Sequence, residues 1–195
     1  MEVNQISLRG RALSSPVFSH ESHGARFSRL PLAIPRLSGR LDELNLLGPE
    51  DLLSQVAAEE TVSVQGQVRS YNNRSGVGSR LVITVFVQSL RTEPGPPEND
   101  LILTGVLCKP PIFRRTPLGR EICDLMLAVP RQYGRADYLP CVAWGSTARQ
   151  AAGLAVGDHV RLEGRLQSRG YVKNENGTQI PKVAYEVSIS ALTLF

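Results

Sequence analysis

Hydrophobic and polar residues alternate along most of the second half of this 195-residue chain. Alternation with a period of two is typical of β-strands that bury one face. It predicts five strands, at residues 101–109, 121–129, 138–144, 158–168 and 182–191. The segment Ser146–Leu154 departs from this pattern, because a Ser–Thr start is followed by alanines and then by glycines. This composition predicts a short helix between the third and fourth strands.

The first half of the chain repeats the second half. A shift of 95 residues aligns Leu8–Arg36 with Leu103–Arg131, and ten of these 29 positions are identical. At a shift of 98, VSVQGQVRS from Val62 aligns with VRLEGRLQS from Val160. Between the copies, four of the eight residues of RTEPGPPE are Pro or Gly, which is typical of a short, stiff linker. We therefore expect two domains, at 1–92 and 99–195, joined by a linker at 93–98.

Five short strands with one helix in this place follow the order of an OB-fold. The sequence thus predicts an all-β protein of two tandem five-stranded OB-fold barrels, each with at most a short helix between strands 3 and 4. The first copy is less regular in its middle, where Arg40–Glu60 holds six acids among helix-forming residues. We expect a short or displaced third strand there.

The composition is that of a globular chain, with 42% apolar residues, a mean hydropathy of −0.12 and a net charge of +4. Of the 22 basic residues, 19 are arginine, which stacks on rings and pairs with phosphate through two hydrogen bonds where lysine cannot. The sequence shows neither a run of 18 apolar residues nor a secretory leader at its start. Cys108, Cys123 and Cys141 have no C-x-x-C spacing, which favours a reducing, cytoplasmic compartment.

The sequence contains no recognisable catalytic or metal-binding pattern. His20, His23 and His159 lack a Cys or carboxylate partner at metal-binding spacing, and neither a phosphate-binding loop nor a nucleophile elbow is present. We therefore expect a protein that is not an enzyme and that needs no cofactor or metal.

Three segments of the second copy carry a family resemblance: LTGVLCKPPIFRRTPLG, LMLAV and the run from Tyr138 to Tyr171, YLPCVAWGSTARQAAGLAVGDHVRLEGRLQSRGY. In their order and spacing they resemble the bacterial single-stranded DNA-binding protein family, whose members stack bases on aromatic side chains of an OB-fold. The resemblance implies sequence-nonspecific binding of single-stranded DNA, which protects strands in replication, recombination or repair. It places the stacking residues at Tyr133, Tyr138, Trp144 and Tyr171, three of them tyrosine where tryptophan is common in the family.

Cations near these aromatic residues would contact phosphates. The candidates in the second copy are Arg114, Arg115, Arg131, Arg135, Arg165, Arg169 and Lys173. The dipeptide Asn176-Gly177 predicts a tight turn in a hairpin that either folds over the strand or forms an exposed tip.

The first copy has fewer aromatic residues at the matching positions. Ser38 stands where the second copy has Tyr133, and only Tyr71 matches Tyr171. We therefore expect the second copy to be the main binding domain. Further contacts are expected in the first copy from Arg9, Arg11, Arg36, Arg40 and Tyr71.

Assemblies of the family typically bring four OB-folds together, so two per chain implies a homodimer. The chain ends in SISALTLF rather than in the acidic tail through which family members recruit replication and repair proteins, which puts such recruitment in doubt. Two alternatives stay open. One is a primosomal protein of the same fold, which binds single strands but acts mainly by contacting a helicase. The other is a protein-interaction or assembly module that uses the acidic, leucine-rich segment Asp42–Glu60 as its contact surface.

Overall fold

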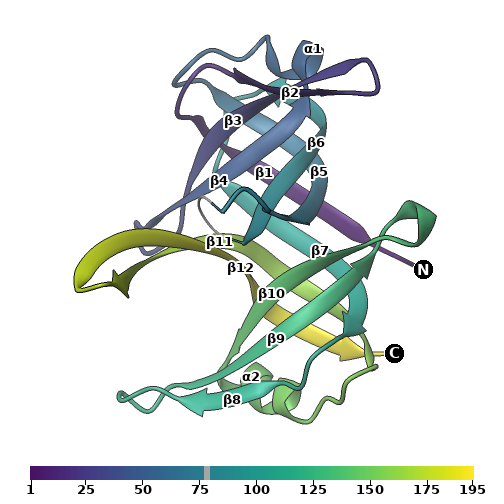
Figure 1. Ribbon diagram of the computed structural model, residues 1–195, viewed down its shortest axis with the longest axis vertical. Helices are drawn as coiled ribbons and strands as arrows, with labels where there is room; N and C mark the ends of the chain where they lie inside the picture. The colour runs from purple at the N-terminus through teal and green to yellow at the C-terminus, as the bar shows by residue number, and fades with distance from the viewer. Residues whose placement is uncertain (77–79) are drawn as a thin grey trace.

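The computed structural model describes residues 1–76 and 80–195, which form two β-barrels joined edge to edge (Figure 1). The first barrel comprises β1 (Asn4–Ala12), β2 (Val17–Ser22), β3 (Ala25–Pro35), β4 (Leu41–Pro49), α1 (Glu50–Leu53), β5 (Thr61–Asn72) and β6 (Leu81–Thr92). The second comprises β7 (Glu98–Leu107), β8 (Ile112–Arg115), β9 (Glu121–Pro130), the short 3₁₀ turn η1 (Gln132–Gly134), β10 (Ala136–Trp144), α2 (Gly145–Ala152), β11 (His159–Glu175) and β12 (Thr178–Leu194).

Each barrel closes through the same five strand pairs. In the first, β1 pairs with β5, β5 with β6, β6 with β4, β4 with β3, and β3 with β1; only β4 and β6 run parallel. The second repeats this circuit with β7, β11, β12, β10 and β9. The short strands β2 and β8 add to the outer edges of β3 and β9. The prediction of two tandem five-stranded OB-fold barrels is therefore confirmed.

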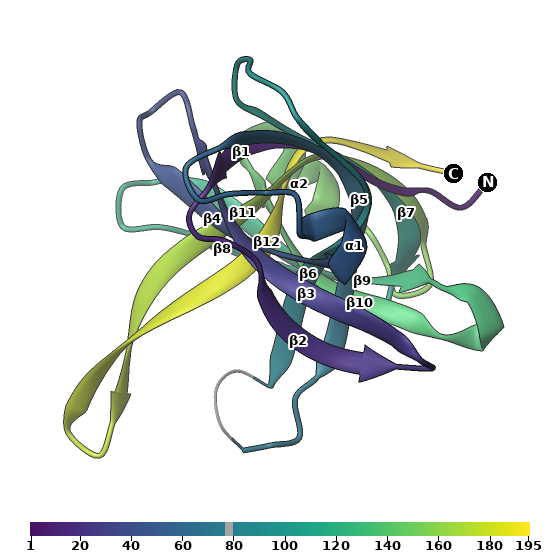
Figure 2. The ribbon, with the colours of Figure 1, turned by 90° about the horizontal axis from the view of Figure 1, so that it is seen from above.

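The barrels meet where β1 and β7 pair antiparallel, from Asn4 opposite Leu103 to Arg9 opposite Glu98. This pairing makes one sheet of 12 strands, with the order β2-β3-β4-β6-β5-β1-β7-β11-β12-β10-β9-β8. Seen from above, the two chain ends lie close together on the side of the molecule where β7 lies (Figure 2). β6 ends at Thr92 and β7 begins at Glu98, so the expected linker lies between the barrels. The assignment of two domains, at 1–92 and 99–195 with a linker at 93–98, stays a prediction.

Apolar residues at alternate positions of each strand point into the barrels and form the core. Ile6 and Leu8 on β1 and Leu103 on β7 are fully buried, while their neighbours Gln5, Ser7 and Ile102 are at most half-buried. β5 and β11 each contain a bulge where a glycine faces the backbone of the neighbouring strand. At Gly164 a Cβ atom would overlap the carbonyl oxygen of Ser188, so only glycine fits this approach.

The expectation of a short or displaced third strand in the first copy is wrong. β4 spans nine residues, as β10 does, and it pairs with β3 over its whole length. Asp42, Leu44 and Leu46 alternate on its inward face and are buried. The acid at an inward position hides the strand pattern, because a carboxylate is seldom buried without a partner. Leu44, Leu46 and Leu53 of this segment are buried in the core, whereas Leu47 lies on the outward row of β4 and is half-buried.

The helix between strands 3 and 4 of the second copy is confirmed, at Gly145–Ala152. β11 and β12 extend beyond their predicted bounds and form a long hairpin arm that curves away from the second barrel (Figure 1). Asn176 (φ 50°) and Gly177 (φ 79°) make its two-residue turn, as the Asn-Gly dipeptide predicts. Residues 169–179 of this arm are exposed, so the hairpin forms an exposed tip.

Candidate nucleic-acid interface

Two of the predicted stacking residues share the outer face of β10. Tyr138 and Trp144 are 48% and 42% exposed, while Leu139, Cys141 and Ala143 between them point inward and are buried. Because side chains on a strand alternate between its faces, these even-numbered positions lie in one row with Pro140 and Val142. Val142, in the same row, is buried, so the two half-exposed rings lie toward opposite ends of the row, and each can stack on a base.

The other two aromatic residues lie at either side of this row. Tyr133 is 95% exposed in η1, where it has a φ of 62° between β9 and β10. Tyr171 is 39% exposed on the β11–β12 arm, with the guanidinium of Arg169 5.9 Å from its ring centre. Both views place the β9–β10 connection and the arm on opposite sides of the second barrel (Figures 1 and 2). A strand that touches all four rings must therefore cross the outer face of β10.

Most of the predicted phosphate-binding cations already face an acid. The ion pairs are Arg114–Asp124 (3.0 Å), Arg115–Glu121 (3.5 Å), Arg131–Asp137 (3.4 Å), Arg169–Glu186 (3.2 Å) and Lys173–Glu175 (3.2 Å). Arg165 instead donates to the side-chain oxygen of Gln167 (3.3 Å). Exposed pairs of this kind stabilise a protein by at most about 1 kcal/mol, so a phosphate can displace the acid. The exception is Arg131, whose partner Asp137 is completely buried.

Arg135 differs from the rest of this set, because among the described residues its side chain has neither an ion pair nor a hydrogen bond. It lies with Tyr133 and Arg131 in a cleft of about 510 Å³ whose opposite wall comes from the first barrel, with Asn4 and Arg69. Burial lowers the pKa of Arg69, and the neighbouring charge of Arg131 adds to this effect. A positive cleft beside an exposed ring can take a phosphate next to a stacked base.

The expected first-barrel cations are also engaged. Arg9 faces Glu93 (3.4 Å) and Glu98 (3.8 Å), Arg11 faces Glu59, and Arg36 holds Asp42. Arg40 lines a groove with Glu43, Ser168 and Arg169, and Tyr71 is exposed on the outer face of β5.

The first barrel also presents aromatic residues that the sequence analysis did not single out. His20 stacks on Phe27 at 5.0 Å between ring centres, and Phe27 lies 6.2 Å from Phe86, which in turn lies 5.5 Å from the guanidinium of Arg69. Phe27 and Phe86 occupy positions that alternate with buried core residues. This alternation can be recognised in the sequence, and it predicts that both phenylalanines face outward.

Two buried aspartates lie at matching places in the barrels, each second in its strand. Asp42 accepts two hydrogen bonds from Arg36, at 2.7 and 2.9 Å. Asp137 receives only one contact from Arg131, and its Oδ2 atom is buried with no hydrogen-bond partner. Burial raises the pKa of the Asp137 carboxyl, although the Ser70 N–H and the charges of Arg131 and Arg69 act in the opposite direction.

Within residues 1–76 and 80–195, no group of three or more His, Cys, Asp or Glu side chains could hold a metal ion. The three cysteines are free thiols, and burial raises the pKa of Cys123 and Cys141. In the same ranges no helix reaches the length and apolar character needed to cross a membrane.

Comparison with known proteins gives consistent similarities. Residues 98–194 match the model of the single-strand binding protein family. The chain is 36% identical over 80 residues to single-stranded DNA-binding protein 2 of Listeria innocua, covering 37% of this chain and 50% of that protein. It is 35% identical over 89 residues to single-stranded DNA-binding protein B of Bacillus subtilis, covering 42% of this chain and 78% of that protein. This chain spans about half the length of the first of these relatives.

The solved structure of the wild-type single-stranded DNA binding protein from Thermus aquaticus is similar over both barrels. Its TM-score is 0.78 at 22% identity, with 99% of this chain and 93% of that chain covered. At this identity the likeness concerns the fold, and it extends through the tandem arrangement.

Proposed function

Since the chain belongs to the single-strand binding protein family, we propose that it binds single-stranded DNA without sequence preference and protects exposed strands in replication, recombination or repair. Bases stack on aromatic side chains, and arginine and lysine side chains contact the phosphates. Stacking tolerates any sequence, because every base has a π-face.

The row formed by Tyr138 and Trp144 on the outer face of β10 is the observation that carries this proposal. Half-exposed rings on a rigid strand lose little conformational freedom when a base stacks on them. Tyr133 and Tyr171 extend the row at either side, and Arg135 and Arg169 lie beside them. This surface needs no cofactor, and nothing in it calls for catalysis.

Titration of the protein with oligothymidine at low and at moderate salt tests the proposal. Stacking on Trp144, the single tryptophan of the chain, should quench its fluorescence. The affinity should fall with salt, with a logarithmic slope of about −0.7 for each phosphate neutralised. Absence of binding at low salt would refute the proposal.

Oligomerisation is part of this proposal. Assemblies of the family typically contain four barrels, and this chain contains two. We therefore expect a homodimer. Light scattering checks this, and a mass equal to that of one 21.3-kDa chain would exclude it. Three free thiols suit a reducing cytoplasm, which is where we place this activity.

A further inference from the structure

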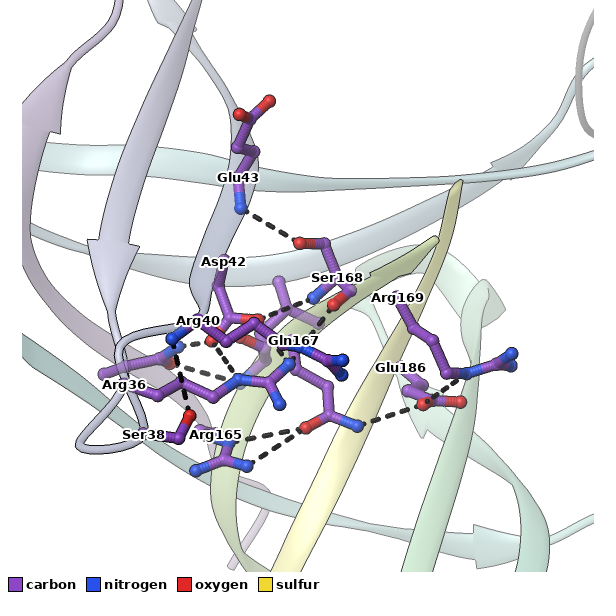
Figure 3. A network of polar contacts seen from close by, with 12 residues as sticks. Arg36, Ser38, Arg40, Asp42, Glu43, Arg165, Gln167, Ser168, Arg169 and Glu186 are labelled. Atoms are coloured by element: carbon purple, nitrogen blue, oxygen red, sulfur yellow. Dashed lines mark hydrogen bonds and ion pairs between the residues drawn. The ribbon is translucent and has the colours of Figure 1, made fainter. Parts of the chain in front are cut away.

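Two serine–aspartate contacts join the barrels, and each barrel supplies one serine and one aspartate. In the first contact, Asp42 Oδ1 of β4 accepts a hydrogen bond from the backbone N–H of Ser168 on β11 (3.0 Å), and Ser168 Oγ accepts from the N–H of Glu43 (3.0 Å). Arg36 donates both to Asp42 and to the carbonyl oxygen of Ser168 (Figure 3).

The second contact repeats these bonds with the barrels exchanged. Asp137 Oδ1 of β10 accepts from the N–H of Ser70 on β5 (2.8 Å), and Ser70 Oγ accepts from the N–H of Tyr138 (2.7 Å). We call the two contacts the serine clamps. Such reciprocity is the geometry of an isologous two-fold interface, here formed within one chain.

The serine clamps adjoin the residues proposed to bind the strand. Tyr138 itself donates to Ser70, so the first barrel holds the backbone of a stacking residue of the second. Ser168 lies at the base of the arm that carries Arg169 and Tyr171 (Figure 3). A groove of about 430 Å³ with walls from the two barrels includes Ile83, the strand partner of Ser70, and Tyr185, the strand partner of Ser168. Its lining includes Asn45 and Val82 of the first barrel and Pro140, Tyr171 and Tyr185 of the second.

From this geometry we infer that the serine clamps fix the two barrels as one binding surface, and that Ser70 and Ser168 are positioning residues for a strand that contacts both barrels. The inference rests on the proposed single-strand binding. Two sites held at a fixed separation bind one long ligand far more tightly than either alone, and this gain decreases when their relative orientation loosens. Loss of the clamp hydroxyls should therefore weaken the binding of long strands more than the binding of short ones.

The test compares oligothymidines of about 6 and about 25 nucleotides, which are within reach of one and of two barrels. In Ser70→Ala/Ser168→Ala both aspartates keep their backbone donors, so no buried carboxylate loses its hydrogen bond from the serine N–H. The affinity for the long strand should fall about tenfold, and the affinity for the short strand should stay within about twofold. Ser190→Ala is the matched control, since it removes a serine hydroxyl bond within the second barrel (3.0 Å to the carbonyl oxygen of Glu163).

Ser168→Thr keeps a hydroxyl at the half-buried clamp and should bind the long strand as the native chain does. Ser168→Ala alone should show a smaller loss of affinity for the long strand. This single variant replaces the double variant in the test if the double variant does not fold. An unchanged long-strand affinity in the alanine variants, an equal loss on both strands, or an equal loss in the threonine variant would overturn the inference. If the native chain binds neither strand, the proposed function itself fails.

Discussion

Tyr138 and Trp144 point from the same face of β10, with the buried side chains of Leu139, Cys141 and Ala143 turned to the other. The strand sets their spacing, so neither ring depends on a flexible loop for its position. The side rings Tyr133 and Tyr171 have no such support, because one lies in a turn and the other on an exposed arm.

Truncation of the side rings should weaken binding without loss of fold. A stacked base contributes about 1 to 3 kcal/mol, so Tyr133→Ala or Tyr171→Ala should lower the affinity for oligothymidine between about 5-fold and 150-fold. Tyr133 is almost fully exposed, so its removal should leave the thermal midpoint unchanged. Fluorescence titration through Trp144 measures the effect, and Leu118→Ala, at another exposed position of the second barrel, is the control. Equal affinities for Tyr133→Ala and Leu118→Ala would remove Tyr133 from the site.

Substitutions of the two arginines beside Tyr133 should have different effects, because Arg131 is paired with a buried aspartate and Arg135 has no ion pair among the described residues. Arg135→Gln should reduce the salt slope of binding by about 0.7, since one phosphate contact is lost, and should leave stability unchanged. Arg131→Gln should instead lower the free energy of unfolding, because it leaves the buried Asp137 carboxylate without its cation. Titrations at several salt concentrations and urea denaturation distinguish the two effects. An unaltered slope in Arg135→Gln would argue against a phosphate at this residue.

Stability should depend on pH through Asp137. Burial raises its folded pKa above the unfolded value of about 3.9, so between these values the folded state binds the proton more readily. The contribution of this carboxyl to the free energy of unfolding is therefore largest at low pH and decreases as pH rises through the folded pKa. Asp137→Asn removes this dependence, so the variant should gain stability relative to the native chain as the pH rises above the unfolded pKa of about 3.9. Urea denaturation across this rise in pH measures the difference, and parallel curves would contradict it.

The bulge glycine of β11 should be intolerant of a side chain. Gly164→Ala places a Cβ atom against the carbonyl oxygen of Ser188 and should destabilise the protein by about 1 to 3 kcal/mol. Gly170→Ala on the same strand is the matched control, because a Cβ there has no neighbouring atom within 4 Å. Chemical denaturation of both variants measures their free energies of unfolding. Equal values would show that the bulge relaxes to accept the added Cβ atom.

Local patterns in the sequence predict the barrels well. The alternation and the repeat identify the strands of the second copy, the helix now seen at Gly145–Ala152, and the tandem arrangement. The third strand of the first copy escapes prediction, because Asp42 occupies a core-facing position that becomes tolerable only beside Arg36 and Ser168. These partners lie 6 and 126 residues away in the sequence, and no local pattern contains them.

The candidate site is predicted less completely than the fold. The sequence points to the exposed rings on β10, in η1 and on the arm, and their role in binding stays a prediction. It does not show that Arg36 and Arg131 form ion pairs with buried aspartates, because the sequence alone does not reveal which acid a given arginine contacts. Alternation along the strands marks Phe27 and Phe86 as outward-facing, but the sequence does not show that they cluster with His20 and Arg69, because these residues come from four different strands.

The pairing of β1 with β7 has a consequence for how the protein behaves on dilution. Residues 4–9 of β1 and 98–103 of β7 pair within their own barrels on at most one side, and an open edge of this kind is a template for association with another chain. Here each edge is occupied by its own repeat, held close by a connection of a few residues between Thr92 and Glu98. An intermolecular contact of this kind would dissociate at low concentration, whereas a tethered one persists at any concentration at which the chain is folded. The paired barrels therefore stay together even where the protein is scarce.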